Sequence, residues 1–462
     1  MINDGDGRNP CGGPRSAAIR SRRSLLTIGG LGALGLSLSD LLAAEAAVVN
    51  KPAAGATAKS VILLYQWGGP SHLETFDMKP NGPEESRGAF KPISSSVEGL
   101  QVCEHLPRFA RVMNKVTLVR SLTHRFRNHN PPGYYGLTGH APPSDDQRLR
   151  DTPDLMPHYG AVLDRLKPSP PDVPSFVAMP AAIHDGSVVP GQHGSFLGKR
   201  HDPLLILQDP NAPDFRLPEL SLPESVPTAR LEDRRGLLEA LDRQAGLMDR
   251  LSAARGLQTH QARAFTMLSS PRLRKAFELG SETPKVRDSY GRTSFGQCTL
   301  LARRLIEAGV RLVSVYYCRP SGGFIWDTHK ENFPELQKSL LPSTDQTVPT
   351  LLADLEDRGL LKETLVIWMG EFGRTPKINQ DAGRDHWPEC YSGILAGGGM
   401  KRGFVYGASD SAGAYPIENP VKPDNIAGTL YHALGINPGT LIHDLQNRPI
   451  AIGGEPIHEL FA

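Results

Sequence analysis

The chain has 462 residues, 39% of them hydrophobic and 22% charged, which is the balance of a globular protein with a large core. Its 51 basic and 49 acidic residues leave a formal net charge of +2, which argues against a nucleic-acid protein built on a basic face. The five cysteines have no CxxC spacing, so a zinc ribbon is not expected. For the four that follow Cys11, one disulfide and scattered buried thiols are the alternatives.

The first 57 residues have the three parts of a targeting peptide. Arg22 and Arg23 stand directly before an apolar run, 25–42, and Ala44 and Ala46 offer an A-x-A-like cleavage site. Paired arginines select the twin-arginine route, so we predict that 1–57 is a signal peptide and linker read by the twin-arginine translocase. The protein would then be periplasmic or extracellular. The alternative is an uncleaved membrane anchor, although a span needs about 20 strongly apolar residues and this run is diluted with glycine.

The next part of the chain predicts two strands and then a long insertion. The apolar run 61–65 ends at a Gly-Gly-Pro turn and is typical of a buried parallel strand, and 116–119 is a second short strand. Residues 142–227 are rich in proline and show little periodicity, which predicts loops. Apolar residues at helical spacing over 228–268 then predict an amphipathic helix or hairpin, as part of a helical insertion near 228–282.

In the last part of the chain, helices alternate with strands. Residues 299–308 and 345–357 are predicted helices, which stop at Gly309 and Gly359. Residues 310–317 and 365–369 are predicted strands. This alternation predicts an α/β domain with a largely parallel sheet.

Polar side chains that suit a metal or an anion follow these strands, where the carboxyl ends of an open α/β sheet bind ligands. Carboxylates and imidazoles bind zinc, manganese and similar ions, and arginines hold phosphate or sulfate. The candidates are Arg125, Arg127, His129 and Asn130 in one loop, Asp327 and His329 after 310–317, and Glu371, Arg374, Asp385 and His386 after 365–369.

Each of these groups also has a purely structural interpretation. Asp327 and His329 could form a turn that caps the next helix, Glu371 could pair with Arg374, and the Asp385-His386 step could be a hydrogen-bonded dyad without metal. A metal site is favoured over these structural interpretations because all the groups are predicted at one edge of one sheet.

At these residues the sequence closely resembles a family of twin-arginine-exported proteins of unknown function within the alkaline phosphatase and sulfatase superfamily. The matching stretches are 67–77 (WGGPSHLETFD), 137–139 (LTG), 301–310 (LARRLIEAGV), 326–329 (WDTH), 370–376 (GEFGRTP) and 383–387 (GRDHW). The resemblance implies one domain over 58–462 with an alkaline phosphatase-like three-layer sandwich, in which helices cover both faces of a mostly parallel sheet.

The resemblance also implies site residues. Asp327, His329 and His386 match the ligands of one superfamily metal, whereas Glu371 stands where the superfamily has another ligand, an Asp. His129 occupies the position of the superfamily nucleophile, so the hydroxyl or formylglycine source is lost.

We therefore predict an exported hydrolase of phosphate or sulfate esters that depends on a divalent ion, zinc in the first place and manganese or calcium as alternatives. The expected ligands are Asp327, His329, Glu371 and His386; the expected catalytic residues are His129 as nucleophile or general acid, Glu371 as base and Arg374; the expected substrate-binding residues are Arg125, Arg127, Asn130, Arg374 and Asp385. The alternative is a non-catalytic protein on the same fold that binds a carbohydrate or a partner.

Overall fold

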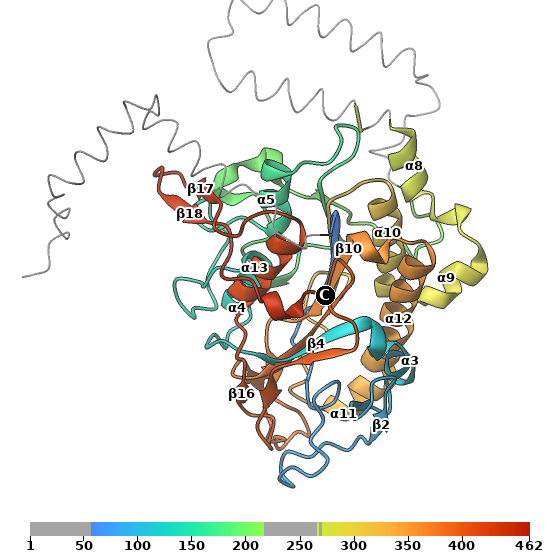
Figure 1. The fold of residues 1–462 in the computed structure, drawn as a ribbon, viewed down its shortest axis with the longest axis vertical. Coiled ribbons are helices and arrows are strands. Elements are labelled where there is room, and N and C mark those ends of the chain that lie inside the picture. Colours follow the sequence, from blue (N-terminus) through green and yellow to red (C-terminus); the bar gives the residue numbers. More distant parts are fainter. Residues whose placement is uncertain (1–56, 217–265, 268–269) are drawn as a thin grey trace, which may run out of the picture. The chain divides into compact units, whose positions relative to one another are not determined.

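The structure is a computed structural model and describes residues 57–216, 266–267 and 270–462. Its centre is an eight-stranded sheet in the order β14-β4-β13-β10-β1-β9-β5-β8 (Figure 1). The strands are β1 (Ser60–Gln66), β4 (Val116–Leu122), β5 (Phe176–Met179), β8 (Leu204–Leu205), β9 (Leu312–Tyr317), β10 (Thr364–Met369), β13 (Tyr391–Ala396) and β14 (Phe404–Tyr406).

The sheet is mixed and mostly parallel, as the sequence predicts. In its middle β1 pairs in parallel with β10 on one side and β9 on the other. β13 is antiparallel to both of its neighbours, β10 and β4, and every other pairing in this sheet is parallel. All seven residues of β1 are buried, because helices cover both of its faces.

The two faces of the sheet bury separate hydrophobic clusters. Ile62 and Leu64 of β1 belong to one cluster, and Val61, Leu63 and Tyr65 belong to the other. The first cluster contains side chains of α3 (Pro107–Val112), α8 (Pro271–Phe277), α9 (Pro284–Tyr290), α10 (Ser294–Glu307) and α12 (Leu341–Asp357), and the second those of α4 (Asn130–Thr138), α5 (Tyr159–Leu166) and α13 (Pro423–Ala433). The predicted three layers are therefore present (Figure 1).

The predicted strands 61–65, 310–317 and 365–369 are β1, β9 and β10 with slightly different ends, and 116–119 extends to Leu122. The predicted helices at 299–308 and 345–357 are α10 and α12, which begin earlier in the chain. α10 starts at Ser294 because the Thr293 side chain accepts a hydrogen bond from the Gly296 N–H and caps the helix.

The prediction that 142–227 is rich in loops agrees with most of its described part, 142–216, although α5 and β5 also lie within it. β5 is a four-residue apolar run among prolines, too short to show a period. The predicted helix at 228–268 lies outside the described residues except for Thr266 and Met267, which are helical, and the predicted signal at 1–57 lies outside them except for Thr57.

None of the helices in the described ranges combines the length and the apolar character that a membrane span needs. The cysteines of these ranges, Cys103, Cys298, Cys318 and Cys390, are buried free thiols. Burial raises the pKa of Cys103 and of Cys318 to about 12, so these thiols are not reactive nucleophiles at neutral pH.

Candidate metal centre

The candidate ligands meet at the carboxyl ends of the central strands. β10, β1 and β9 are adjacent and parallel, so the loops that follow them lie at one edge of the sheet. The loop after β9 carries Asp327 and His329, and Glu371 follows the end of β10. A small antiparallel ladder of β11 (Gly373–Arg374) and β12 (His386–Trp387) then sets His386 opposite Arg374.

Three ligand atoms form a tight triangle. Oδ1 of Asp327 lies 3.1 Å from Nε2 of His329 and 3.1 Å from Nε2 of His386. The two Nε2 atoms are 2.9 Å apart. The three atoms are thus within hydrogen-bond distance of one another and would have to move only slightly apart to share one small cation.

The other nitrogen of each ring fixes its tautomer. Nδ1 of His386 lies 2.7 Å from the carbonyl oxygen of Arg127, which can only accept, so this nitrogen donates its proton. Nδ1 of His329 lies 2.7 Å from Oδ1 of Asp385 and donates likewise. When the rings are neutral, both Nε2 atoms therefore direct lone pairs at each other and at the Asp327 carboxylate. Metal-ligating histidines have this arrangement, in which the second ring nitrogen donates to a carboxylate or carbonyl.

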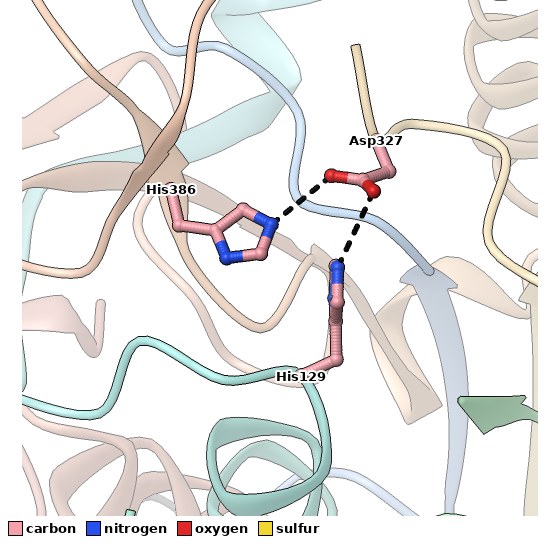
Figure 2. Close-up of side chains that lie close together, drawn as sticks. All are labelled: His129, Asp327 and His386. Atoms are coloured by element: carbon pink, nitrogen blue, oxygen red, sulfur yellow. Dashed lines mark hydrogen bonds and ion pairs between the residues drawn. The ribbon is translucent and has the colours of Figure 1, made fainter. Parts of the chain in front are cut away.

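His129, the N-cap residue of α4, lies beside His386, with ring centres 4.4 Å apart, and contacts the second carboxylate oxygen of Asp327 (Figure 2). Its Nε2 is 3.5 Å from Oδ2 of Asp327, and its Nδ1 is 2.9 Å from Oε1 of Glu371. That Oε1 also accepts the Gly68 N–H at 2.9 Å. Ligand atoms of His129, Asp327 and His386 all lie within 4.8 Å of one another, which is a further grouping that could hold an ion.

Arg374 lies beneath this centre and is fully buried. Its guanidinium donates to Oδ1 of Asp327 at 2.5 Å, to the carbonyl of Gly69 at 3.0 Å and to the carbonyl of Arg384 at 3.1 Å, and it also contacts the carbonyl of Gly68. Every guanidinium nitrogen is thus bonded to the protein. Arg374 fixes the carboxylate of Asp327 and the turn after β1.

The charges at this centre shift its pKa values. Burial alone would lower the pKa of His129, but the nearby carboxylates of Asp327 and Glu371 outweigh it and raise the pKa to about 9. Burial lowers the pKa of His386 to about 4, with Asp327 opposing the shift. Burial raises the pKa of Glu371, against the hydrogen bond from His129. Without an ion, the centre thus holds a proton on His129 between two carboxyl groups.

The expected substrate-binding residues are spread around the centre. Arg125 and Arg127 are exposed, and the guanidinium of Arg127 lies 5.4 Å from the centre of the Trp387 ring and pairs with Glu389. The exposed Asp385 holds His329.

The structure turns Asn130 away from the centre. Its amide nitrogen donates to the carbonyl oxygens of Gln147, Leu149 and Asp185, at distances of 2.8, 3.3 and 3.3 Å.

Sequence reasoning did not find the aromatic side chains that pack on the imidazoles. Phe324 stacks on His129 with ring centres 4.8 Å apart, and Phe372 stacks on His386 at 4.3 Å. Phe372 had a signal, because it lies in the GEFGRTP stretch, whereas nothing near Phe324 singles it out.

An ion pair beside the centre was also missed. Nη2 of Arg384 lies 2.6 Å from Oε1 of Glu74, and both side chains are buried. Arg384 precedes Asp385 and His386, so the pair anchors the segment that carries them.

A family model described as "Protein of unknown function (DUF1501)" matches residues 58–461. None of the curated protein sequences matches the chain. Similar solved structures include the lipoteichoic acid synthase LtaP from Listeria monocytogenes (9% identity over 87% of this chain and 76% of that chain, TM-score 0.39). A second is the PsFucS1 sulfatase from Pseudoalteromonas sp., with 13% identity over 96% of this chain and 76% of that chain and a TM-score of 0.38. A third is the phosphonate monoester hydrolase SpPMH from Silicibacter pomeroyi, with 12% identity over 83% of this chain and 74% of that chain and a TM-score of 0.33. At such TM-scores the likeness says nothing about activity.

Proposed function

The chain belongs to the DUF1501 family, whose function is unknown, and we propose that it is an exported, metal-dependent hydrolase of phosphate or sulfate esters. One observation carries the proposal: lone pairs of Asp327, His329 and His386 converge within 3.1 Å of one another with both Nδ1 atoms already bonded. A metal ion would relieve the repulsion between these lone pairs, which in the metal-free protein is offset by a proton, because the contact with Asp327 raises the pKa of His329.

The donor set indicates which ion would bind. Two imidazoles and a carboxylate suit zinc or manganese, whereas calcium takes oxygen ligands throughout. A bound ion supplies Lewis-acid chemistry, polarising an ester oxygen and lowering the pKa of water. Asp327, His329 and His386 hold it, and Asp385 and the Arg127 carbonyl aim the two rings.

Two exposed arginines in the loop beside the ligands support an anionic substrate. Arg127 is exposed, and its own carbonyl accepts the bond from His386, so its side chain starts beside the ligands. Arg125 is exposed two residues earlier. Guanidinium groups bind phosphate and sulfate oxygens in pairs. In the reaction a water oxygen bonds to phosphorus or sulfur, and the ester oxygen leaves with the bonding pair and a proton as an alcohol.

The proposal is tested with purified protein. Metal content is measured by mass spectrometry, and turnover is measured on p-nitrophenyl phosphate, p-nitrophenyl sulfate and a p-nitrophenyl phosphonate with and without a chelator. We expect bound metal and turnover of at least one ester, both lost with the chelator and in Asp327→Ala. Folded, metal-free protein that turns over none of them overturns the proposal, and glycan binding by that protein would support the non-catalytic alternative.

Export is proposed on Arg22 and Arg23 and tested separately. Replacing both by lysine should retain the protein in the cytoplasm, whereas the unchanged chain should be found outside it after cell fractionation. Export of the lysine variant by the same route would contradict the proposal.

A further inference from the structure

We infer that His129 is a fourth protein ligand of the metal centre, which thus consists of three histidines and one aspartate. The inference rests on the proposed metal site and adds to it. It reassigns the residue that stands at the expected nucleophile position.

The hydrogen bonds of His129 leave its Nε2 free to bind an ion. Oε1 of Glu371 already accepts from the Gly68 N–H, and it accepts from Nδ1 of His129 as well, at 2.9 Å. Nδ1 therefore carries the proton of the neutral ring. Nε2 is buried, has no hydrogen-bond partner among the described residues, and faces Oδ2 of Asp327 at 3.5 Å. Without a metal ion a proton on Nε2 offsets the charge of the carboxylate; in the neutral ring Nε2 directs its lone pair at Oδ2 of Asp327, and a metal ion between the two atoms would take the place of that proton.

The separation fits a shared ion. Two ligands about 2.1 Å from a tetrahedral zinc ion lie roughly 3.4 Å apart, close to the 3.5 Å between His129 and Asp327. The distances of 2.9 and 3.1 Å among the ligand atoms of Asp327, His329 and His386 would have to increase only slightly. His129 then follows the pattern of His329 and His386, in which the second ring nitrogen donates a hydrogen bond to an acceptor outside the ligand set. For His129 this acceptor is the carboxyl group of Glu371.

The surroundings hold the His129 ring still. Phe324 stacks on it at 4.8 Å, and the rings of Trp67 and Phe372 lie 5.3 and 5.1 Å away. Its side chain is only 5% exposed. A fixed ring suits a ligand, whereas a nucleophile that carries a transferred group needs room for that group. With Nε2 on the ion, no phosphoryl or sulfuryl group is transferred to His129, and water attacks the ester directly.

The test compares metal affinity among three variants by competition with a zinc chelator. His129→Gln should lose at least tenfold in affinity, and Glu371→Ala should lose about 10- to 100-fold through the lost outer acceptor. His124→Gln is the matched control and should keep its affinity. His124 is a half-buried histidine of the same loop whose Nε2 donates to the Glu371 backbone carbonyl at 2.7 Å. Circular dichroism of the metal-free proteins checks that each variant folds.

A second readout does not depend on affinity. In the cobalt-substituted protein, His129→Gln should change the visible absorption bands, because a ligand is removed, and His124→Gln should not. Unchanged affinity and an unchanged cobalt spectrum in His129→Gln overturn the inference, as does a covalent adduct on His129 trapped by alkaline quench. Absence of wild-type turnover on every ester, with metal lost in His129→Gln, would overturn the proposed function and leave this inference standing.

Discussion

The Nε2 atoms of His329 and His386 lie 2.9 Å apart, although the Nδ1 atom of each ring already donates a hydrogen bond. In the neutral rings both Nε2 atoms carry lone pairs, so their approach is repulsive until a proton or a metal ion lies between them. The chain therefore gains stability when an ion binds, because the ion binds the folded state and relieves this repulsion.

Binding of zinc should raise the melting temperature, and His386→Ala should abolish the rise. Free ligand at 100 times its Kd stabilises a folded protein by about 2.7 kcal/mol. Thermal melts with zinc and with chelator measure the difference. His443→Ala is the control, because His443 is exposed on β17 (Leu441–His443), outside the centre, and should keep the full rise. An equal rise in His386→Ala would place the ion elsewhere.

Asp385 should tune the metal affinity without touching the ion. Asp385→Ala removes the acceptor of the His329 Nδ1 proton, and loss of such an acceptor costs about 10- to 100-fold in affinity. Asp385→Asn keeps an acceptor oxygen and should lose less. Chelator competition ranks the variants, and equal affinity in all three proteins would show that the solvent replaces this bond at no cost.

Replacing only one partner of the buried ion pair of Glu74 and Arg384 should destabilise the fold. Glu74→Gln leaves the Arg384 guanidinium buried without its carboxylate, and breaking a buried pair in this way costs about 3–5 kcal/mol of unfolding free energy. The double variant Glu74→Leu/Arg384→Met should recover much of that loss, because it leaves no charge buried. Urea unfolding in chelator measures both. A single variant as stable as the wild type would contradict the expected cost.

His158 should make the fold sensitive to acid. Burial lowers the pKa of this histidine to about 3, so between that value and the ordinary 6.5 the unfolded chain binds a proton that the folded chain does not. Stability is thus full above pH 6.5 and falls as the pH drops below it, by up to about 1.4 kcal/mol per pH unit.

The variant His158→Asn tests whether His158 causes this loss of stability at low pH. The asparagine oxygen can still accept the Gly160 N–H that His158 accepts at 2.9 Å, so α5 keeps its cap. Urea unfolding at pH 7, 6 and 5 in chelator should show a smaller loss for His158→Asn than for the wild type. The exposed His443→Ala should retain the wild-type slope, and an unchanged slope in His158→Asn would assign the acid sensitivity to other groups.

The sequence predicted the sheet and the meeting of the ligands for one physical reason. Apolar runs such as 61–65 and 365–369 are buried on both faces, which parallel strands require, and the carboxyl ends of neighbouring parallel strands share an edge. Asp327 and His386 therefore had to lie near each other once β9 and β10 were identified.

The partners within the site could not be predicted in the same way. The pairing of Arg374 with His386 depends on a two-residue ladder with no pattern of its own, and Arg374 in a sequence looks the same whether it is exposed or buried. The order of the strands in the sheet is likewise a tertiary result, since β13 enters it against the direction of its neighbours.

The positions of the ligands along the chain set a condition on biosynthesis. His129 follows β4, Asp327 and His329 follow β9, and His386 precedes β13, so the centre is complete only after the ribosome has passed the last of them. A chain truncated before His386 would contain the core strands β1, β9 and β10 but an incomplete ligand set. The proposed ion could therefore bind only after six of the eight strands of the central sheet have been synthesised, whereas β13, β14 and α13 still follow His386 along the chain.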